Sequence, residues 1–128
     1  MQNRSATATT SAPTVAPAPI FLAHILTPAP VWGYDGAQLG FGRALALDQA
    51  SGQPLCLLVG RGREMRSLRP VPWAALRYDL RLRAYLADVT APLFTQGPGW
   101  PRAACRARAC VRRAHIYYDV YYDTQDQS

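Results

Sequence analysis

The chain has 128 residues, a length that fits one domain with a single modest hydrophobic core. All fourteen basic side chains are arginines and only eight side chains are acidic, so the net charge is +6, which favours an acidic partner: nucleic acid, an anionic membrane face or an acidic protein. An odd count of three cysteines argues against a disulfide-stapled secreted domain, and no apolar run approaches the ~20 residues that span a bilayer, so we expect a cytoplasmic protein.

Residues 1–19 consist almost entirely of Ala, Thr, Ser and Pro, which cannot build a packed face. We interpret them as a disordered arm. The ordered domain is expected over residues 20–96, followed by an arginine-rich segment and a tyrosine-rich tail over residues 97–128.

Short apolar runs separated by turn signals follow from Val31 onward. Asp35-Gly36 predicts a tight hairpin, because glycine tolerates a positive φ. The next strand, residues 41–48, alternates in polarity and places four side chains on one side: Phe41, Arg43, Leu45 and Leu47. After a turn over residues 49–52, the run 54–59 is apolar on both faces and predicts the most buried strand.

Two further strands are predicted beyond a loop at residues 60–64. Residues 69–73 contain two prolines and predict an extended edge strand with few hydrogen-bond donors. Residues 80–87 alternate, with Leu80, Leu82, Ala84 and Leu86 on the buried side and Arg81, Arg83, Tyr85 and Ala87 on the other. A charge at Leu82 or Leu57 is therefore expected to unfold the domain. Thr90 can cap a short helical turn that contains Pro92.

No helix of ordinary length fits between residues 25 and 90. The predicted class is therefore all-β, a small barrel with a disordered N-terminal arm and a short C-terminal helix.

The order and spacing of these elements resemble the PRC-barrel family over about residues 25–95. The first half of that resemblance is carried by Pro30-Val31, Tyr34-Asp35-Gly36, Leu39-Gly40, Leu47-Asp48, Ser51-Gly52 and Leu57-Leu58-Val59. The second half is carried by Val71-Pro72-Trp73 with Leu76, and by residues 86–90 with Leu93. The arginine-rich loop at residues 60–69 and the segment from Gly97 onward depart from the family pattern.

The resemblance implies a compact β scaffold for protein assembly. Members occur in the H subunit of photosynthetic reaction centres and in a ribosome-maturation factor. The family shares no catalytic residues, so no activity can be carried over to this chain.

Nothing in the sequence combines into a catalytic or cofactor site. His24 and His115 have no serine or cysteine nucleophile at a local spacing, and the two glycine-rich turns lack the pattern of a phosphate-binding loop. Cys105, Cys110 and His115 lie five residues apart, which is not a zinc spacing. Cys56 is interpreted as a small buried apolar side chain. We expect no enzyme activity, no metal, no cofactor and no small-molecule substrate.

The candidate partner-binding residues all lie near the C-terminus, in an alanine-rich stretch that favours a helix and in the aromatic stretch after it, which could be a strand or an adhesive tail. They are Arg102, Arg106, Arg108, Arg112, Arg113, Tyr117, Tyr118, Tyr121 and Tyr122. Two interpretations remain open. The helix can pack its alanines on the barrel while the tyrosines cover an open end, or the segment can bind a partner.

A protein partner, including a second copy of the chain, is the preferred partner, because Tyr and Arg dominate protein interfaces. RNA or the ribosome is the alternative, because arginines beside aromatic rings suit phosphates and bases. A membrane face is the least favoured.

Overall fold

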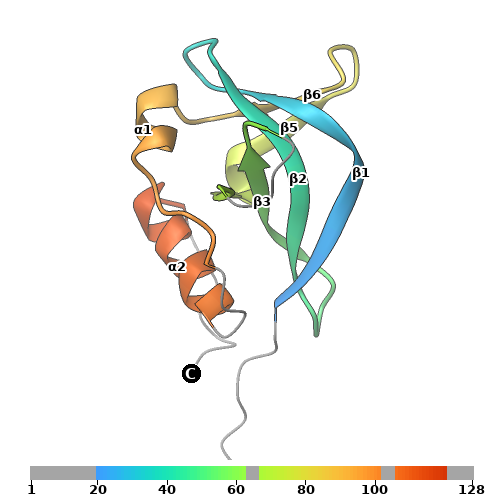
Figure 1. The fold of residues 1–128 in the computed structure, drawn as a ribbon, viewed down its shortest axis with the longest axis vertical. Coiled ribbons are helices and arrows are strands. Elements are labelled where there is room, and N and C mark those ends of the chain that lie inside the picture. Colours follow the sequence, from blue (N-terminus) through green and yellow to red (C-terminus); the bar gives the residue numbers. More distant parts are fainter. Residues whose placement is uncertain (1–19, 63–66, 102–105, 121–128) are drawn as a thin grey trace, which may run out of the picture.

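The fold is a six-stranded curled sheet that forms half of a barrel, with two helices against it (Figure 1). It is seen in a computed structural model that describes residues 20–62, 67–101 and 106–120. The sheet order is β4-β3-β2-β1-β6-β5. Its strands are β1 (Ile20–Trp32), β2 (Gln38–Asp48), β3 (Pro54–Gly60), β4 (Arg69–Pro72), β5 (Leu76–Asp79) and β6 (Ala84–Ala87). The mostly-β class predicted from the sequence is confirmed, and the predicted arm at residues 1–19 lies outside the described residues.

The tight turn between β1 and β2 forms where Asp35-Gly36 predicted it. Gly33 N–H donates to the carbonyl of Ala37 at 2.7 Å, and Gly36 has a φ of +83°. Further along β2, a Cβ atom on Gly40 would lie 2.6 Å from the carbonyl oxygen of Gly60 in β3. Glycine at position 40 therefore allows β2 and β3 to approach closely.

The core consists of two clusters on opposite faces of the sheet. The inner cluster, on the barrel side, contains Val31, Leu39, Leu57, Val59, Val71, Ala87, Val89, Phe94 and Tyr118. The outer cluster contains Ala44, Ala46, Cys56, Leu58, Leu68, Val111 and Ala114. Consecutive residues of β3 belong to different clusters because side chains alternate along a strand. Cys56 to Val59 are 0% exposed, which confirms that this strand is the most buried.

β2 and β4 also match the sequence predictions. In β2 the residues Gly42, Ala44 and Ala46 are buried, and the alternate positions from Phe41 to Leu47 are half-buried on the other face. β4 forms one edge of the sheet and pairs with β3 alone, with Leu57 opposite Val71. Its two prolines remove backbone donors, as expected for an edge strand.

The predicted strand over residues 80–87 is wrong in its first half, and in its second half Tyr85 and Ala87, expected on the exposed side, pack in or against the inner cluster, whereas Leu86 lines a hollow at the surface. β5 and β6 form a hairpin, and residues 80–83 are the turn between them. The carboxylate of Asp79 accepts hydrogen bonds from the N–H groups of Arg81 and Leu82 at 2.9 and 3.0 Å, which stabilises this turn. Leu80 and Leu82 are consequently 80% and 61% exposed, so a charge at Leu82 is not expected to unfold the domain.

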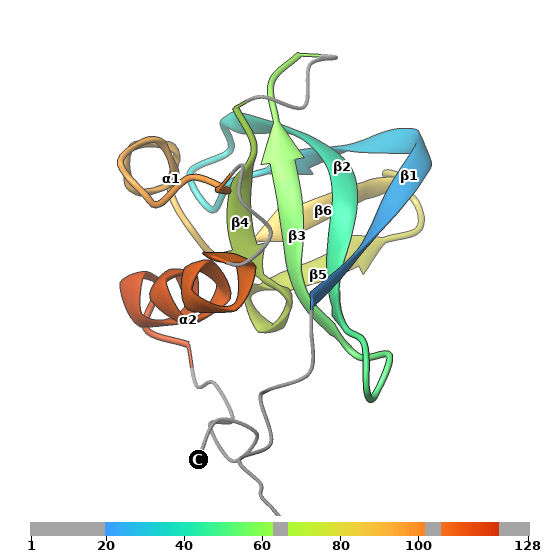
Figure 2. The same ribbon diagram turned by 60° about the horizontal axis from the view of Figure 1, so that its bottom comes forward.

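Two helices follow the sheet. α1 (Ala91–Thr95) is capped by Thr90, whose hydroxyl accepts from the N–H of Leu93 at 3.4 Å, with Pro92 in the first turn, as predicted. α2 (Ala107–Tyr117) lies beside β4 and β3 (Figure 2). Ile116 and Tyr117 belong to α2, so the prediction that an aromatic strand begins at Ile116 is wrong.

Replacing Leu57 with alanine is expected to lower the free energy of unfolding by about 2–5 kcal/mol, because a fully buried leucine is lost and a cavity remains. Leu82→Ala is the matched control and should change it by no more than about 0.5 kcal/mol. Urea denaturation followed by circular dichroism measures both. Equal losses for the two variants would contradict the packing described for the hairpin turn.

Candidate interaction surfaces

α2 has one buried face and one exposed face. Ala107, Cys110, Val111, Ala114 and His115 are buried, and Val111 and Ala114 join the outer cluster on the sheet. The exposed face, here called the arginine face, consists of Arg106, which directly precedes the helix, and Ala109, Arg112, Arg113 and Ile116. No acidic residue occurs in α2. The arginine face is therefore a positively charged strip whose orientation is set by the apolar residues on the other side of the helix.

Arg108 lies on neither of these faces. Its guanidinium lies 3.4 Å from a carboxylate oxygen of Asp48 at the end of β2, and both side chains are largely buried. The hydroxyl of Ser51 donates to the same carboxylate at 3.0 Å. Arg108 therefore joins α2 to the turn between β2 and β3, and its charge is engaged within the molecule.

Two of the candidate tyrosines pack against the barrel. The hydroxyl of Tyr117 donates to the carbonyl of Leu93 in α1 at 2.7 Å. Tyr118 is 9% exposed and belongs to the inner cluster with Phe94, and burial raises the pKa of its phenol above its usual range. These two side chains connect α2 to α1 and to the barrel. Arg102, Tyr121 and Tyr122 lie outside the described residues.

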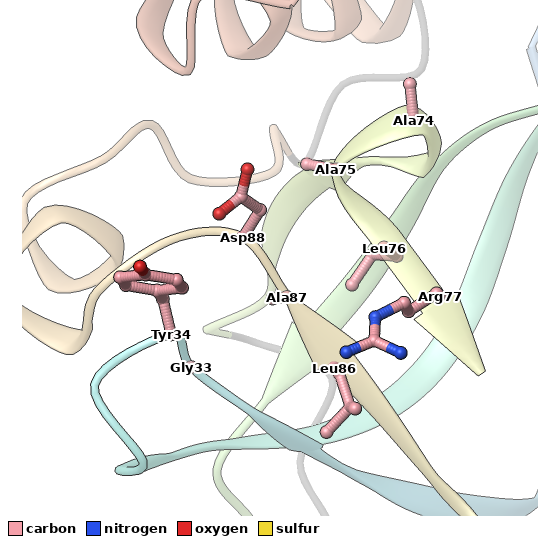
Figure 3. A pocket seen from close by; sticks show the side chains of 9 residues that line it. All are labelled: Gly33, Tyr34, Ala74, Ala75, Leu76, Arg77, Leu86, Ala87 and Asp88. Atoms are coloured by element: carbon pink, nitrogen blue, oxygen red, sulfur yellow. The ribbon is translucent and has the colours of Figure 1, made fainter. Parts of the chain in front are cut away.

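A second surface is a shallow hollow of about 460 Å³ beside β5 and β6 (Figure 3). Leu86 and Arg77 face each other across the hairpin, and Tyr34 and Asp88 lie on the opposite side. Leu76 and four small residues complete the wall, and the small residues leave the space open: Gly33, Ala74, Ala75 and Ala87. A guanidinium, a carboxylate and a phenol around an apolar floor can contact a polar segment of another molecule.

Sequence reasoning missed this hollow. Tyr34, Arg77 and Asp88 are far apart in the chain, and no local spacing connects them. Two backbone hydrogen bonds bring the segments together: Tyr34 N–H donates to the carbonyl of Val89 at 2.7 Å, and Asp88 N–H to that of Ala75 at 2.8 Å.

The buried thiols and the buried imidazole pack within the molecule. Burial raises the pKa of Cys56 far above its usual range, and it also raises that of Cys110, against the opposing effect of Arg113. The thiol of Cys110 donates to the carbonyl of Gly99 at 3.1 Å, and Nδ1 of His115 donates to that of Val111 at 2.8 Å. Cys105 lies outside the described residues, among which no three His, Cys, Asp or Glu side chains gather to hold a metal.

Comparison with known proteins finds no family model and no curated protein that matches this chain. The resemblance to PRC-barrels therefore depends on the residues and motifs given above. Within the described part of the chain, neither helix is long and apolar enough to cross a membrane.

Stability is expected to depend on the protonation of His115. Burial lowers the pKa of this imidazole below its ordinary value of 6.5, although the hydrogen bond to Val111 raises it. The unfolded chain therefore takes up the proton first as the pH falls, and the free energy of unfolding should decrease between about pH 7 and pH 5. Chemical denaturation at a series of pH values measures this decrease.

The variants His115→Gln and His24→Gln test the assignment. The first removes the buried imidazole and should flatten the dependence on pH. The second removes an exposed imidazole on β1 and should preserve it. If the free energy of unfolding of His115→Gln still decreased with falling pH as in the unchanged protein, another group would be responsible for the dependence.

Proposed function

We propose that this protein is a non-catalytic interaction module, a PRC-like barrel that docks on an acidic surface of another protein through its arginine face. The observation that carries the proposal is the division of α2 into a buried apolar side and an exposed side with Arg106, Arg112 and Arg113. Arginine suits this task because its planar guanidinium binds carboxylates through two hydrogen bonds.

Exposed apolar side chains on α2 and α1 favour a protein partner. Ile116 on the arginine face is 71% exposed, and Leu93 in the neighbouring helix α1 is 40% exposed. The hydrogen bond from Tyr117 to Leu93 holds α1 and α2 together. Exposed aliphatic groups beside arginines provide the combination of apolar contact and charge that protein interfaces use.

The barrel supports the proposal as a scaffold. A curled sheet with a turn at Asp35-Gly36 and an edge strand at Val71-Pro72 follows the element order that suggested a PRC-barrel. The resemblance to that family implies that this chain assembles with other proteins. α2 lies beyond the residues that carry the resemblance, so the arginine face is an addition of this chain to the scaffold.

RNA is the alternative partner, because a helix with arginines and no acid also suits phosphates. RNA recognition adds stacking of bases on exposed aromatic rings. Here Tyr118 is buried and Tyr117 is half-buried against α1, so neither ring lies on the arginine face. A protein partner is therefore preferred.

The double variant Arg106→Glu/Arg113→Glu is expected to weaken binding of the acidic partner about tenfold or more, because two attractive charges become repulsive. The partner is first identified by crosslinking and mass spectrometry in the native cell, and its affinity is then measured with purified proteins. The matched control is Arg81→Glu/Arg83→Glu, which makes the same change of net charge at the exposed β5–β6 turn. Equal weakening in both variants would indicate general charge attraction and contradict docking through α2.

Single-stranded RNA distinguishes the alternative. If the three arginines of the arginine face neutralise phosphates, the logarithm of the binding constant should fall with the logarithm of salt concentration at a slope of roughly −2. The alternative would be established if the protein bound RNA with that slope, if Arg106→Glu/Arg113→Glu abolished this binding, and if Arg81→Glu/Arg83→Glu retained it. RNA would then take the place of a protein as the proposed partner.

A further inference from the structure

The first half of β1 is poorly covered by the rest of the molecule. Of the thirteen residues of β1, only Val31 is buried, although most of them are apolar. Residues 20–26 read Ile-Phe-Leu-Ala-His-Ile-Leu, without a formal charge at neutral pH, a proline or a glycine. Phe21 is 53% exposed and Leu26 is 95% exposed. A sequence with such high β propensity and so little charge is unusual on a free surface.

This stretch also has an open backbone edge. On one side β1 pairs with β2, from Ile20 opposite Asp48 to His24 opposite Ala44, and again from Ala29 to Trp32. On the other side β6 reaches only Val31 and Trp32. Between residues 20 and 30, β1 therefore has no strand of the described chain on its second side, and it runs along the right-hand margin of the molecule in Figure 1. Unpaired N–H and C=O groups on such an edge can pair with another strand.

The two ends of the sheet are better protected. At one end, Pro70 and Pro72 leave β4 with fewer N–H groups to offer. At the other end, β5 is only four residues long and includes the charged residues Arg77 and Asp79. Short strands, prolines and charges are the usual devices that prevent pairing between chains. The first half of β1 has none of them.

We propose that two copies of this chain associate by antiparallel pairing of residues 20–24 of β1 with the same residues of the second copy. A two-fold axis brings identical surfaces together, so the edge of one copy must be compatible with the same edge of the second copy. The chain carries a net charge of +6, and arginines approaching arginines would repel. This edge lacks arginine, and two copies can meet there without that repulsion.

The side chains on both faces of the edge fit this pairing. Ile20 and Leu22 pack against the outer cluster, and Ile25 packs against the inner cluster. A second β1 beside the first would extend both clusters and cover Phe21. Arg106, Arg112 and Arg113 are not among the residues that pair, so the pairing can be tested separately from the arginine face.

Analytical ultracentrifugation of the full chain at micromolar and higher concentrations tests the proposal. The expected result is a dimer. Phe21→Lys and His24→Lys should each weaken it, Phe21→Lys at least about tenfold, because a charge enters the strand pair twice. His24 is exposed, so His24→Lys keeps the fold and remains informative if Phe21→Lys unfolds the protein.

The matched control is Ile116→Lys, which adds the same charge at an exposed apolar position of α2 and should leave the dimer intact. Hydrogen exchange provides the second measurement: amides of residues 20–24 should become more protected as the dimer forms. A chain that stays monomeric, a dimer that survives both β1 variants, or a dimer lost equally in Ile116→Lys would overturn the proposal. None of these results bears on docking through Arg106 and Arg113.

Discussion

The burial of β3 on both faces is the constraint on which the rest of the structure depends. Leu57 and Val59 face the barrel, and Cys56 and Leu58 face the opposite way, and all four are inaccessible to water. A curled sheet can cover only its inner face, so a strand that is apolar on both sides requires a second layer. α2 provides that layer with Val111 and Ala114.

The same packing decides which part of α2 faces solvent. Since the apolar stripe of the helix must contact the outer face of the sheet, Arg112 and Arg113 point away from it. The ion pair between Arg108 and Asp48 adds a polar contact at the margin of this layer. The surface proposed for recognition is thus a consequence of how the core is covered. A separate domain is not needed to provide the arginine face.

An incompletely closed sheet leaves edges, and this chain treats them differently. Prolines protect β4 and shortness protects β5, whereas the first half of β1 combines an open backbone edge with apolar side chains. Such a difference within one small sheet would direct pairing to one place, as the proposed role in assembly requires. With self-pairing at β1 and a charged face on α2, two copies would present two arginine faces to a partner, which increases the effective affinity.

Much of the local structure was predictable from the sequence, because turns and strand faces depend on neighbouring residues. The turn at Asp35-Gly36, the two-sided strand at Leu57-Leu58, the proline-containing edge strand and the cap at Thr90 all follow from local chemistry. The alternation of leucines from Leu80 to Leu86 was misleading, because period-two spacing cannot distinguish a strand from a hairpin turn stabilised by the carboxylate of Asp79.

The long-range contacts depend on how the sheet curls. Arg108 meets Asp48 across sixty residues, Tyr118 packs beside Phe94, and Tyr34, Arg77 and Asp88 come to surround one hollow. Composition and spacing alone could assign neither the inward packing of Tyr118 nor the open edge of β1. The physical reason is that strand pairing and burial are properties of segments distant in the chain, and their energies exist only once the chain has folded.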